Sequence, residues 1–325
     1  MVAGGDVDFS GGARSWLGAD QHYDPLAGVK PVLEGSTLRV ASLASALSAK
    51  SKAGKGGAML GPESGAAALS RAGLDGVAVA NGRLFAAGTP FFDETLAVLS
   101  RSHVTALGTT DDPNTLRPQE FQRDGWSVAL FATGVWPDAG APQDGKNRIA
   151  LGDPARLGAA VRAARATHDV VLVSHHAGKE TEDPPAEELA LARAALEAGA
   201  DAYFAHGARV PRGVGWVNDR PALYGLGSLV TDEDPKNPWT GRGLIARLAF
   251  SSDGQRTVDV CPYLIVDGEP KLLSGSGRSV QEGIFRRALE RLSAGFGAVD
   301  IGEPDVHSCM RLGPPHAPPA AAPGP

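Results

Sequence analysis

Length, composition and charge exclude several classes of protein. The chain has 325 residues, enough for one large domain or two modest ones. Its 31 Lys and Arg residues are outnumbered by 37 Asp and Glu residues, which gives a net charge of −6. Because no basic surplus is available to replace the counterions of a nucleic-acid backbone, we expect no nucleic-acid partner.

The sequence contains no signal for a membrane span or for export. No apolar run approaches the roughly 20 residues that cross a bilayer, and residues 1–5 lead straight into polar residues without a basic and apolar leader. We therefore expect a cytoplasmic protein without a transmembrane segment. A start site further upstream would allow an export signal and a place in the cell envelope.

The two cysteines, Cys261 and Cys309, lie far apart in the sequence. Beyond about residue 302, Pro-Pro, Ala-Pro and Gly-Pro pairs predict a disordered tail at 303–325, which leaves residues 1–302 as the globular part. Because Cys309 falls in that tail, we expect no disulfide framework. Two cysteines are also too few for a Cys-based zinc site.

Short apolar runs alternate with helical patterns along most of the chain. The pattern predicts strands at 76–80, 104–107, 127–132, 169–174 and 202–204, another beginning at 222, and a hairpin of 244–251 with 257–266 around Asp253-Gly254. Amphipathic periodicity predicts helices at 68–74, 91–100, 154–167, 187–198 and 279–296. The sequence therefore predicts an α/β protein with covered sheets.

Polar residues follow several of these strands, and ligands of open α/β sheets bind at the carboxyl ends of strands. Asp6 and Asp8 alternate along an extended segment and would point the same way as two oxygen ligands for a cation. His175-His176 comes directly after an apolar strand. The alternatives are a Gly-Asp turn for the aspartates and a structural role for the histidines.

Asn81 and His206 also follow predicted strands. Taken singly, each is better explained as a turn-forming or structural residue. Together with the aspartates and the histidine pair, they would converge on one edge of one sheet, which favours a shared site.

Six blocks spread over the chain are similar, in order and spacing, to those of one family. Its blocks are a Gly-Asp strand end, Asn-Leu-Glu, Ala-Asn-Asn-His, His-Trp-Gly-x-Glu, Gly-His-His-Pro-His and Tyr-Ser-Leu-Gly-Asn-Phe. The counterparts here are Gly5-Asp6, Ser42-Leu43-Ala44, Ala80-Asn81-Gly82-Arg83, His176-Ala177-Gly178-Lys179-Glu180, Ala205-His206-Gly207-Ala208-Arg209 and Tyr224-Gly225-Leu226-Gly227-Ser228-Leu229.

Over roughly residues 3–300 the chain thus resembles the CapA (poly-γ-glutamate capsule synthesis) family of the calcineurin-like phosphoesterase superfamily. The resemblance implies an α/β fold, a layered α/β/β/α sandwich of two mixed sheets flanked by helices. It also implies a role related to capsule polymer synthesis.

The chain departs from the family at the positions that resemble a two-metal centre. Those positions read Ala44, Gly82, Arg83, Gly207 and Arg209. The metal ligands that the resemblance leaves are Asp6 and His176, with Asn81 and His206 as neighbours and Asp8 as a substitute. A metal-dependent hydrolase needs its cations to activate water and to bind phosphoryl oxygens. We therefore expect no metal, or a single weakly bound Mn, Fe or Zn ion.

Arg83 and Arg209 stand where relatives place metal-facing histidines. Our hypothesis is that these guanidiniums take over the space and charge of the lost metals beside the carboxylates. The alternative is that the site decayed and both arginines are surface residues.

Three functions follow as hypotheses. The first is binding of an anionic polymer or small molecule by Arg83, Arg209 and Lys179 without hydrolysis. The second is a metal-dependent phosphoesterase-like hydrolase with a remodelled site, and the third is a non-catalytic scaffold in an envelope or capsule assembly. Neither catalytic residues nor the oligomeric state follow from the sequence.

Overall fold

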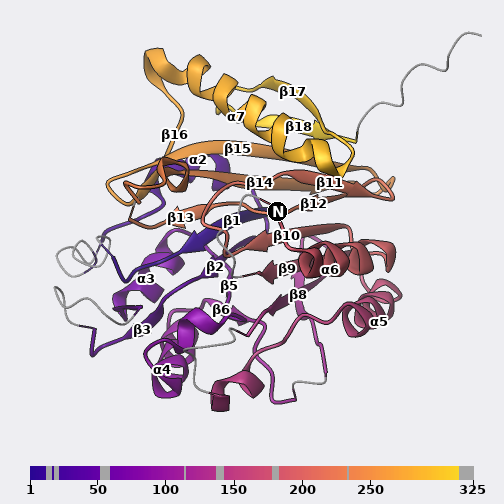
Figure 1. The fold of residues 1–325 in the computed structure, drawn as a ribbon. Helices are drawn as coiled ribbons and strands as arrows, with labels where there is room; N and C mark the ends of the chain where they lie inside the picture. The colour runs from indigo at the N-terminus through magenta and orange to yellow at the C-terminus, as the bar shows by residue number, and fades with distance from the viewer. Residues whose placement is uncertain are drawn as a thin grey trace, which may run out of the picture.

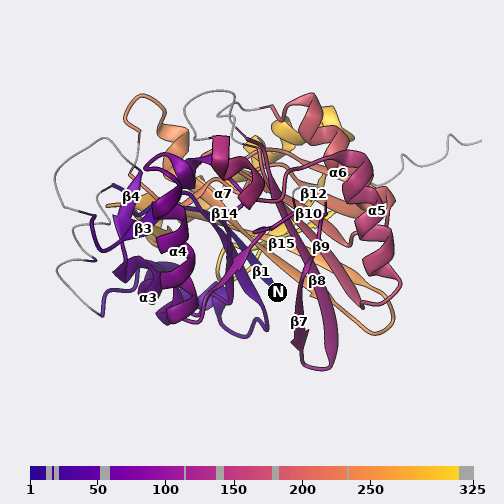
Figure 2. The ribbon, with the colours of Figure 1, turned by 90° about the horizontal axis from the view of Figure 1, so that it is seen from below.

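The computed structural model describes residues 1–11, 17, 22–51, 59–112, 115–136, 143–177, 183–232 and 234–314. In this part of the chain two large β-sheets face each other, and helices cover their outer faces (Figure 1). Helices α3 (Ser64–Arg71) and α4 (Thr89–Arg101) lie on one side, and α5 (Pro154–Arg165) and α6 (Ala186–Glu197) on the other (Figure 2). This layered α/β/β/α arrangement confirms the predicted fold class.

The larger sheet is mixed: a parallel group around β1 continues into an antiparallel group through β14. Its strands are, in spatial order, β17 (Asp300–Pro304), β18 (Met310–Gly313), β15 (Arg256–Val266), β14 (Arg242–Phe250), β1 (Val2–Val7), β2 (Arg39–Leu43), β5 (Gly76–Ala78) and β6 (Thr105–Leu107), with β13 (Ser228–Val230) paired to β1 and β16 (Glu269–Leu272) to β15.

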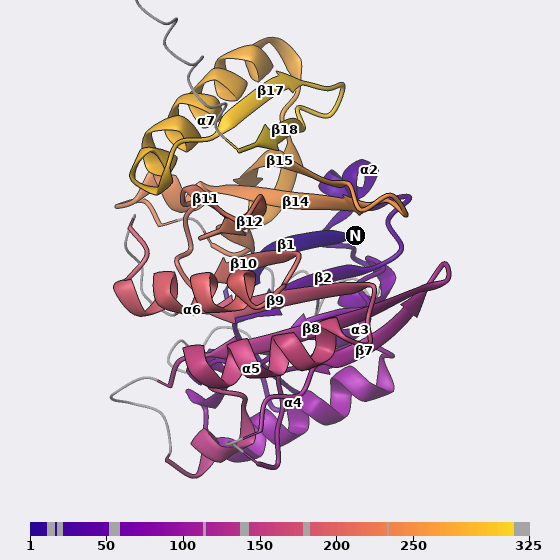
Figure 3. The same cartoon turned by 90° about the vertical axis from the view of Figure 1, so that its right-hand side faces the viewer.

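The second sheet has a parallel centre and antiparallel edges. Its order is β11 (Val214–Val217), β12 (Arg220–Leu223), β10 (Ala202–His206), β9 (Val170–His176), β8 (Trp126–Gly134) and β7 (Gln119–Arg123). Helix α7 (Arg278–Ser293) lies beside β17 and β18 (Figure 3). The remaining elements are β3 (Ala46–Ser48), β4 (Leu60–Pro62), α2 (Lys30–Leu33) and the 3-10 segments η1 (Ala27–Val29), η2 (Gly82–Phe85), η3 (Gln143–Arg148), η4 (Pro238–Gly241), η5 (Gly275–Gly277) and η6 (Ala294–Phe296).

Three buried apolar clusters fill the three interfaces between the layers. Strand alternation sends neighbouring side chains to different clusters. Val77 of β5 packs in the cluster shared with α3 and α4, whereas Ala78 packs between the two sheets. Likewise, Leu172 of β9 faces the other sheet and Val171 faces α5 and α6. Burial on both faces explains why these strands read as continuous apolar runs.

The predicted helices form where their end signals lie. Asp153 caps α5 by accepting a hydrogen bond of 2.8 Å from the Arg156 amide, and Pro154 begins the helix. Helix α6 ends before Gly199, whose φ of +112° favours glycine. The buried face of α5 is the one that its periodicity predicts, with Leu157, Val161 and Ala164.

The prediction that the chain forms no disulfide is wrong. Cys261 of β15 and Cys309 are joined by a disulfide, and both are buried. The two residues become neighbours because β15 pairs with β18, with Val260 opposite Met310. A contact made across 48 residues leaves no local signal in the sequence.

The start predicted for the disordered tail was also too early. Residues 300–304 and 310–313 form β17 and β18 at the edge of the larger sheet. Residues 315–325 of the predicted tail lie outside the described residues. The helix predicted at 279–296 forms as α7, which ends at Ser293, followed by the 3-10 segment η6. The periodicity predicts that Val280 is buried together with Leu289 and Leu292. Leu289 and Leu292 are buried, whereas Val280 is exposed.

Strands from the two sheets meet at one edge, and this meeting positions the candidate site. The Gly207 amide, directly after β10, donates a hydrogen bond of 2.7 Å to Oδ2 of Asp6 in β1. A close approach beside Asp6 also requires glycine, because a Cβ on Gly5 would lie 2.0 Å from the Gly227 carbonyl oxygen.

Among the described residues, no helix is long and apolar enough to cross a membrane.

Candidate functional site

Asp6 is the innermost carboxylate of the site. It is 4% exposed, and its Oδ1 lies 3.5 Å from Nδ1 of His176 while Oδ2 accepts the Gly207 amide. Burial alone would raise the pKa of Asp6. Interactions with His176 first, and then with His206 and Ser42, outweigh burial, so the pKa of Asp6 lies well below its usual range. Asp6 is therefore a buried, ionised carboxylate.

His176 and His206 lie opposite each other on the neighbouring strands β9 and β10. Both are buried, and each contacts a serine hydroxyl: His176 Nδ1 lies 3.3 Å from Ser42 Oγ, and His206 Nε2 lies 3.1 Å from Ser174 Oγ. Burial lowers the pKa of His206 to about 4, although Asp6 opposes this shift. We therefore expect a neutral His206 imidazole at neutral pH.

His175 points to the other face of the same sheet, away from Asp6. Its Nδ1 lies 3.0 Å from Thr133 Oγ1, and its ring lies 6.2 Å from that of Tyr203. Burial, together with His176 and His206, lowers the pKa of His175 to about 3. Because side chains alternate along β9, His176 lies in the site and His175 packs in the core on the other face of the sheet.

Asn81 has a turn-forming role. Its Nδ2 donates to the Leu43 carbonyl at 2.9 Å, and its Oδ1 accepts the Arg83 amide at 3.1 Å, which caps η2. Both ends of the amide are thus bonded to backbone. The cap aligns the segment that carries Arg83.

Arg83 and Asp8 lie side by side, nearer the surface than Asp6. The closest guanidinium nitrogen is 3.9 Å from Asp8 Oδ2, and the Arg83 side chain is 27% exposed. The other carboxylate oxygen of Asp8 accepts hydrogen bonds from the amide and hydroxyl of Ser10 at 2.8 and 2.6 Å. The structure therefore brings together one arginine and one aspartate of the predicted set.

Arg209 lies in the segment that follows β10, with the left-handed φ of +59°. It is half-buried, and a guanidinium nitrogen donates to the Asp232 carbonyl oxygen at 3.5 Å. Lys179, the third predicted ligand-binding residue, lies outside the described residues.

Ser42, Ser174 and the Gly207 amide belong to the site but carry no signal as ligands in the sequence. Ser42 is opposite Asp6 in the register of β1 and β2, and Ser174 precedes the histidine pair. The signal that could have found them is their position at the ends of strands that the fold brings to one edge.

The donor atoms of the described residues do not form a two-metal centre. Among the buried side-chain atoms that lack a hydrogen-bond partner in the described chain, three belong to Asp6, His176 and His206, namely Asp6 Oδ1, His176 Nε2 and His206 Nδ1. However, the described residues contain no group of three or more His, Cys, Asp or Glu side chains arranged to bind a metal ion. Two cations in a hydrolase of this type each need several such ligands.

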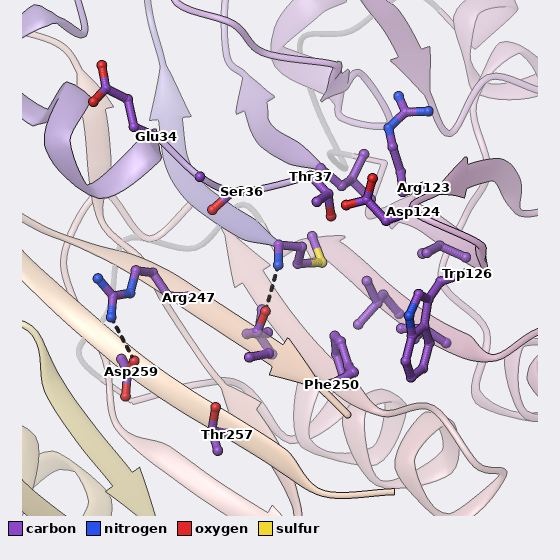
Figure 4. A pocket seen from close by; sticks show the side chains of 18 of the residues that line it. Glu34, Ser36, Thr37, Arg123, Asp124, Trp126, Arg247, Phe250, Thr257 and Asp259 are labelled. Carbon is purple, nitrogen blue, oxygen red and sulfur yellow. Dashed lines mark hydrogen bonds and ion pairs between the residues drawn. The ribbon is translucent and has the colours of Figure 1, made fainter. Parts of the chain in front are cut away.

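A cavity of about 530 Å³ lies at the opposite end of the strands, around Met1 (Figure 4). Asp6 is five residues further along β1, about 17 Å away at 3.3 Å per residue. Trp126 and Phe250 line the cavity, and Arg247 there is bonded to Asp259 at 3.0 Å. No predicted site residue lines it, so it is distinct from the candidate site.

Solved structures support the fold. A hypothetical protein from Thermus thermophilus is 15% identical, with a TM-score of 0.50, and the match covers 82% of this chain and 99% of that one. A putative 5'-nucleotidase from Staphylococcus aureus, solved with alpha-ketoglutarate, is 13% identical, also with a TM-score of 0.50, over 89% of this chain and 58% of that one. At these identities the likeness concerns the fold alone.

Curated relatives match over short stretches. The uncharacterized protein y4sH of Sinorhizobium fredii is 38% identical over 76 residues, which is 22% of this chain and 16% of that protein. Capsule biosynthesis protein CapA of Bacillus anthracis is 30% identical over 106 residues, 32% of this chain and 25% of that protein. The matches thus span a quarter or less of these relatives.

A family model covers most of the chain. The model of the bacterial capsule synthesis protein PGA_cap matches residues 1–233, which includes every candidate site residue named above. This match agrees with the resemblance of the six sequence blocks and with the layered fold. The chain belongs to the bacterial capsule synthesis protein PGA_cap family.

Proposed function

We propose that this protein acts in capsule polymer synthesis and binds an anionic ligand at the edge formed by Asp6, His176, His206, Arg83 and Arg209, without hydrolysis by a two-metal centre. Family membership supports the first part. The observation that carries the second part is that protein groups surround Asp6: its Oδ2 accepts the Gly207 amide at 2.7 Å, and its Oδ1 lies 3.5 Å from His176 Nδ1.

Arg83 is the group best suited to meet the ligand. A guanidinium is permanently charged and presents five N–H donors, more than one carboxylate can accept. Its contact with Asp8, at 3.9 Å and partly exposed, is of the kind that contributes little energy. A ligand carboxylate can therefore compete with Asp8 for the guanidinium.

Poly-γ-glutamate is the ligand class that fits both the family and the site. It carries one carboxylate per residue, so several weak contacts along one chain can add up. The protein's net charge of −6 repels a polyanion at long range. Binding must therefore come from the local arginines, and it should weaken as salt screens them.

The disulfide supports a place outside the cytoplasm. Disulfides form and persist in oxidising compartments, whereas cytosolic thiols are kept reduced. Both cysteines of the chain are used in a buried bond. We therefore propose the cell envelope in place of the cytoplasm expected from the sequence.

Calorimetric titration with poly-γ-glutamate at low salt tests the proposal. We expect Arg83→Gln and Arg209→Gln each to weaken binding about tenfold, equivalent to about 1.4 kcal/mol. Arg101→Gln is the matched control, because Arg101 is an exposed arginine of α4 paired with Glu63. Unchanged binding in both site variants would reject the site and favour the scaffold hypothesis.

The three unpartnered atoms of Asp6, His176 and His206 favour a second candidate, a hydrolase with one divalent cation. It predicts phosphoesterase turnover that requires added metal and is lost in Asp6→Ala. Our proposal predicts no such turnover in either protein.

A further inference from the structure

A buried ion pair lies behind the candidate site. Arg212 donates a hydrogen bond of 2.9 Å to Oε2 of Glu188, and neither side chain has any exposed surface. Arg212 also donates to the Tyr224 carbonyl oxygen at 3.4 Å. Glu188 belongs to the first turn of α6, whereas Arg212 lies just before β11. The pair therefore joins a helix on the outer face to the segment that leaves β10.

The pair is a poor source of stability. Taking two charges out of water costs nearly as much as their attraction returns, so apolar replacements of the same size are often neutral. Burial raises the pKa of Glu188 to about 7, although Arg212 acts in the opposite direction. What such a pair does supply is a defined geometry, since the guanidinium has a fixed set of donor directions.

The segment that the pair fixes is the one that carries Arg209. It begins at Gly207, whose amide is bonded to Asp6, and it ends at Arg212 and Gly213. The Arg212 amide donates to the Gly225 carbonyl at 3.1 Å, and the Gly213 carbonyl accepts the Tyr224 amide at 3.1 Å. Between these anchors, Gly207 and Arg209 have φ values of +91° and +59°. The left-handed region is unfavourable for an arginine, so the surrounding contacts must impose it.

We infer that Glu188 and Arg212 are positioning residues, which hold the Gly207–Gly213 segment so that Arg209 faces the anion site while the Gly207 amide binds Asp6. The role of Arg209 in this inference rests on the proposed function. The role of the pair in ordering the segment does not, and it can be measured without a ligand.

A second buried ion cluster provides a matched control. Asp201 is 2% exposed and pairs with Arg165 at 2.8 Å and with Arg256 at 2.7 Å. It precedes β10, at the end of that strand opposite the Gly207–Gly213 segment. Asp201→Asn therefore removes a comparable buried charge without touching the segment.

The experiment compares Glu188→Gln with Asp201→Asn by hydrogen exchange of the Gly207–Gly213 segment and by poly-γ-glutamate titration. We expect at least tenfold faster exchange and about tenfold weaker binding in Glu188→Gln alone. Equal exchange of the segment in the two variants overturns the inference. Faster exchange with unchanged binding also overturns it, because the segment would then not present Arg209.

Two further outcomes keep the inference and the proposed function distinguishable. If the unaltered protein does not bind the polymer, the proposed function fails, and exchange still decides whether the pair orders the segment. If Glu188→Gln does not fold, the double variant Glu188→Leu with Arg212→Met replaces the pair by apolar side chains of similar size. The same faster exchange is expected there, and wild-type exchange would overturn the inference.

Discussion

A single aspartate illustrates how this site works at the scale of residues. Asp6 stays ionised in a buried position, where the Gly207 amide holds its Oδ2 and His176 Nδ1 lies 3.5 Å from its Oδ1. In a two-metal hydrolase, cations would do this work. In the proposed function, these protein groups hold Asp6 without a cation.

His175 provides a pH test at the same scale. Its pKa in the folded protein is about 3, below the value of 6.5 for an unperturbed histidine. As the pH falls, the unfolded chain takes up the proton first. His175 therefore contributes stability above pH 6.5 that is lost progressively toward pH 3, at about 1.4 kcal/mol per pH unit.

We expect His175→Asn to flatten the pH dependence of the free energy of unfolding by about this slope. Urea unfolding at several values between pH 7 and 4.5 measures it. His103→Asn is the control, because His103 is exposed and has a φ of +58° that asparagine accepts. An identical slope in His175→Asn and the unaltered protein would contradict the assignment.

At the scale of elements, local patterns specified much of what the structure contains. The capped helix α5, the glycine-terminated α6 and the β14–β15 hairpin follow from residues within each segment. Strands β17 and β18 do not. Strand β18 pairs with β15, some 50 residues away, and β17 pairs with β18, while the nearby prolines favour an irregular tail.

The candidate site divides in the same way. Asp6 and His176 could be predicted because each ends an apolar strand. The contribution of the Gly207 amide depends on how the two sheets meet, and the direction of Arg209 depends on its own left-handed backbone. Neither property can be predicted from the neighbouring residues in the sequence.

A prediction at the scale of elements concerns the disulfide between Cys261 and Cys309. Closing a loop of 48 residues stabilises the folded state by about 4 kcal/mol in the chain-entropy account. We expect Cys309→Ser to lower the free energy of unfolding by about this amount, measured by urea denaturation.

Cys261→Ser and reduced unaltered protein should match Cys309→Ser, and the double serine variant should lose no more, because all four lack the same bond. Two reactive thiols in denatured, unreduced protein isolated from an oxidising compartment would show that the bond does not form.

At the scale of the whole molecule, the fold explains why the site can change its chemistry without losing its place. Two sheets packed face to face bring the ends of β1, β9 and β10 to one edge (Figure 3). Three apolar clusters maintain that arrangement regardless of which polar residues line the edge. In the proposed function, arginines can therefore take the place of metal ligands while the layered sandwich persists.

The most direct test of this account is the number of metal ions that the protein retains. The purified protein would be loaded with Mn²⁺, freed of excess metal by dialysis and analysed by mass spectrometry. Because the described residues contain no group of three or more His, Cys, Asp or Glu side chains arranged to bind a metal, we predict substantially less than one ion per chain. One or two ions per chain that survive dialysis, and that are lost in Asp6→Ala, would contradict the account and restore a metal-dependent hydrolase.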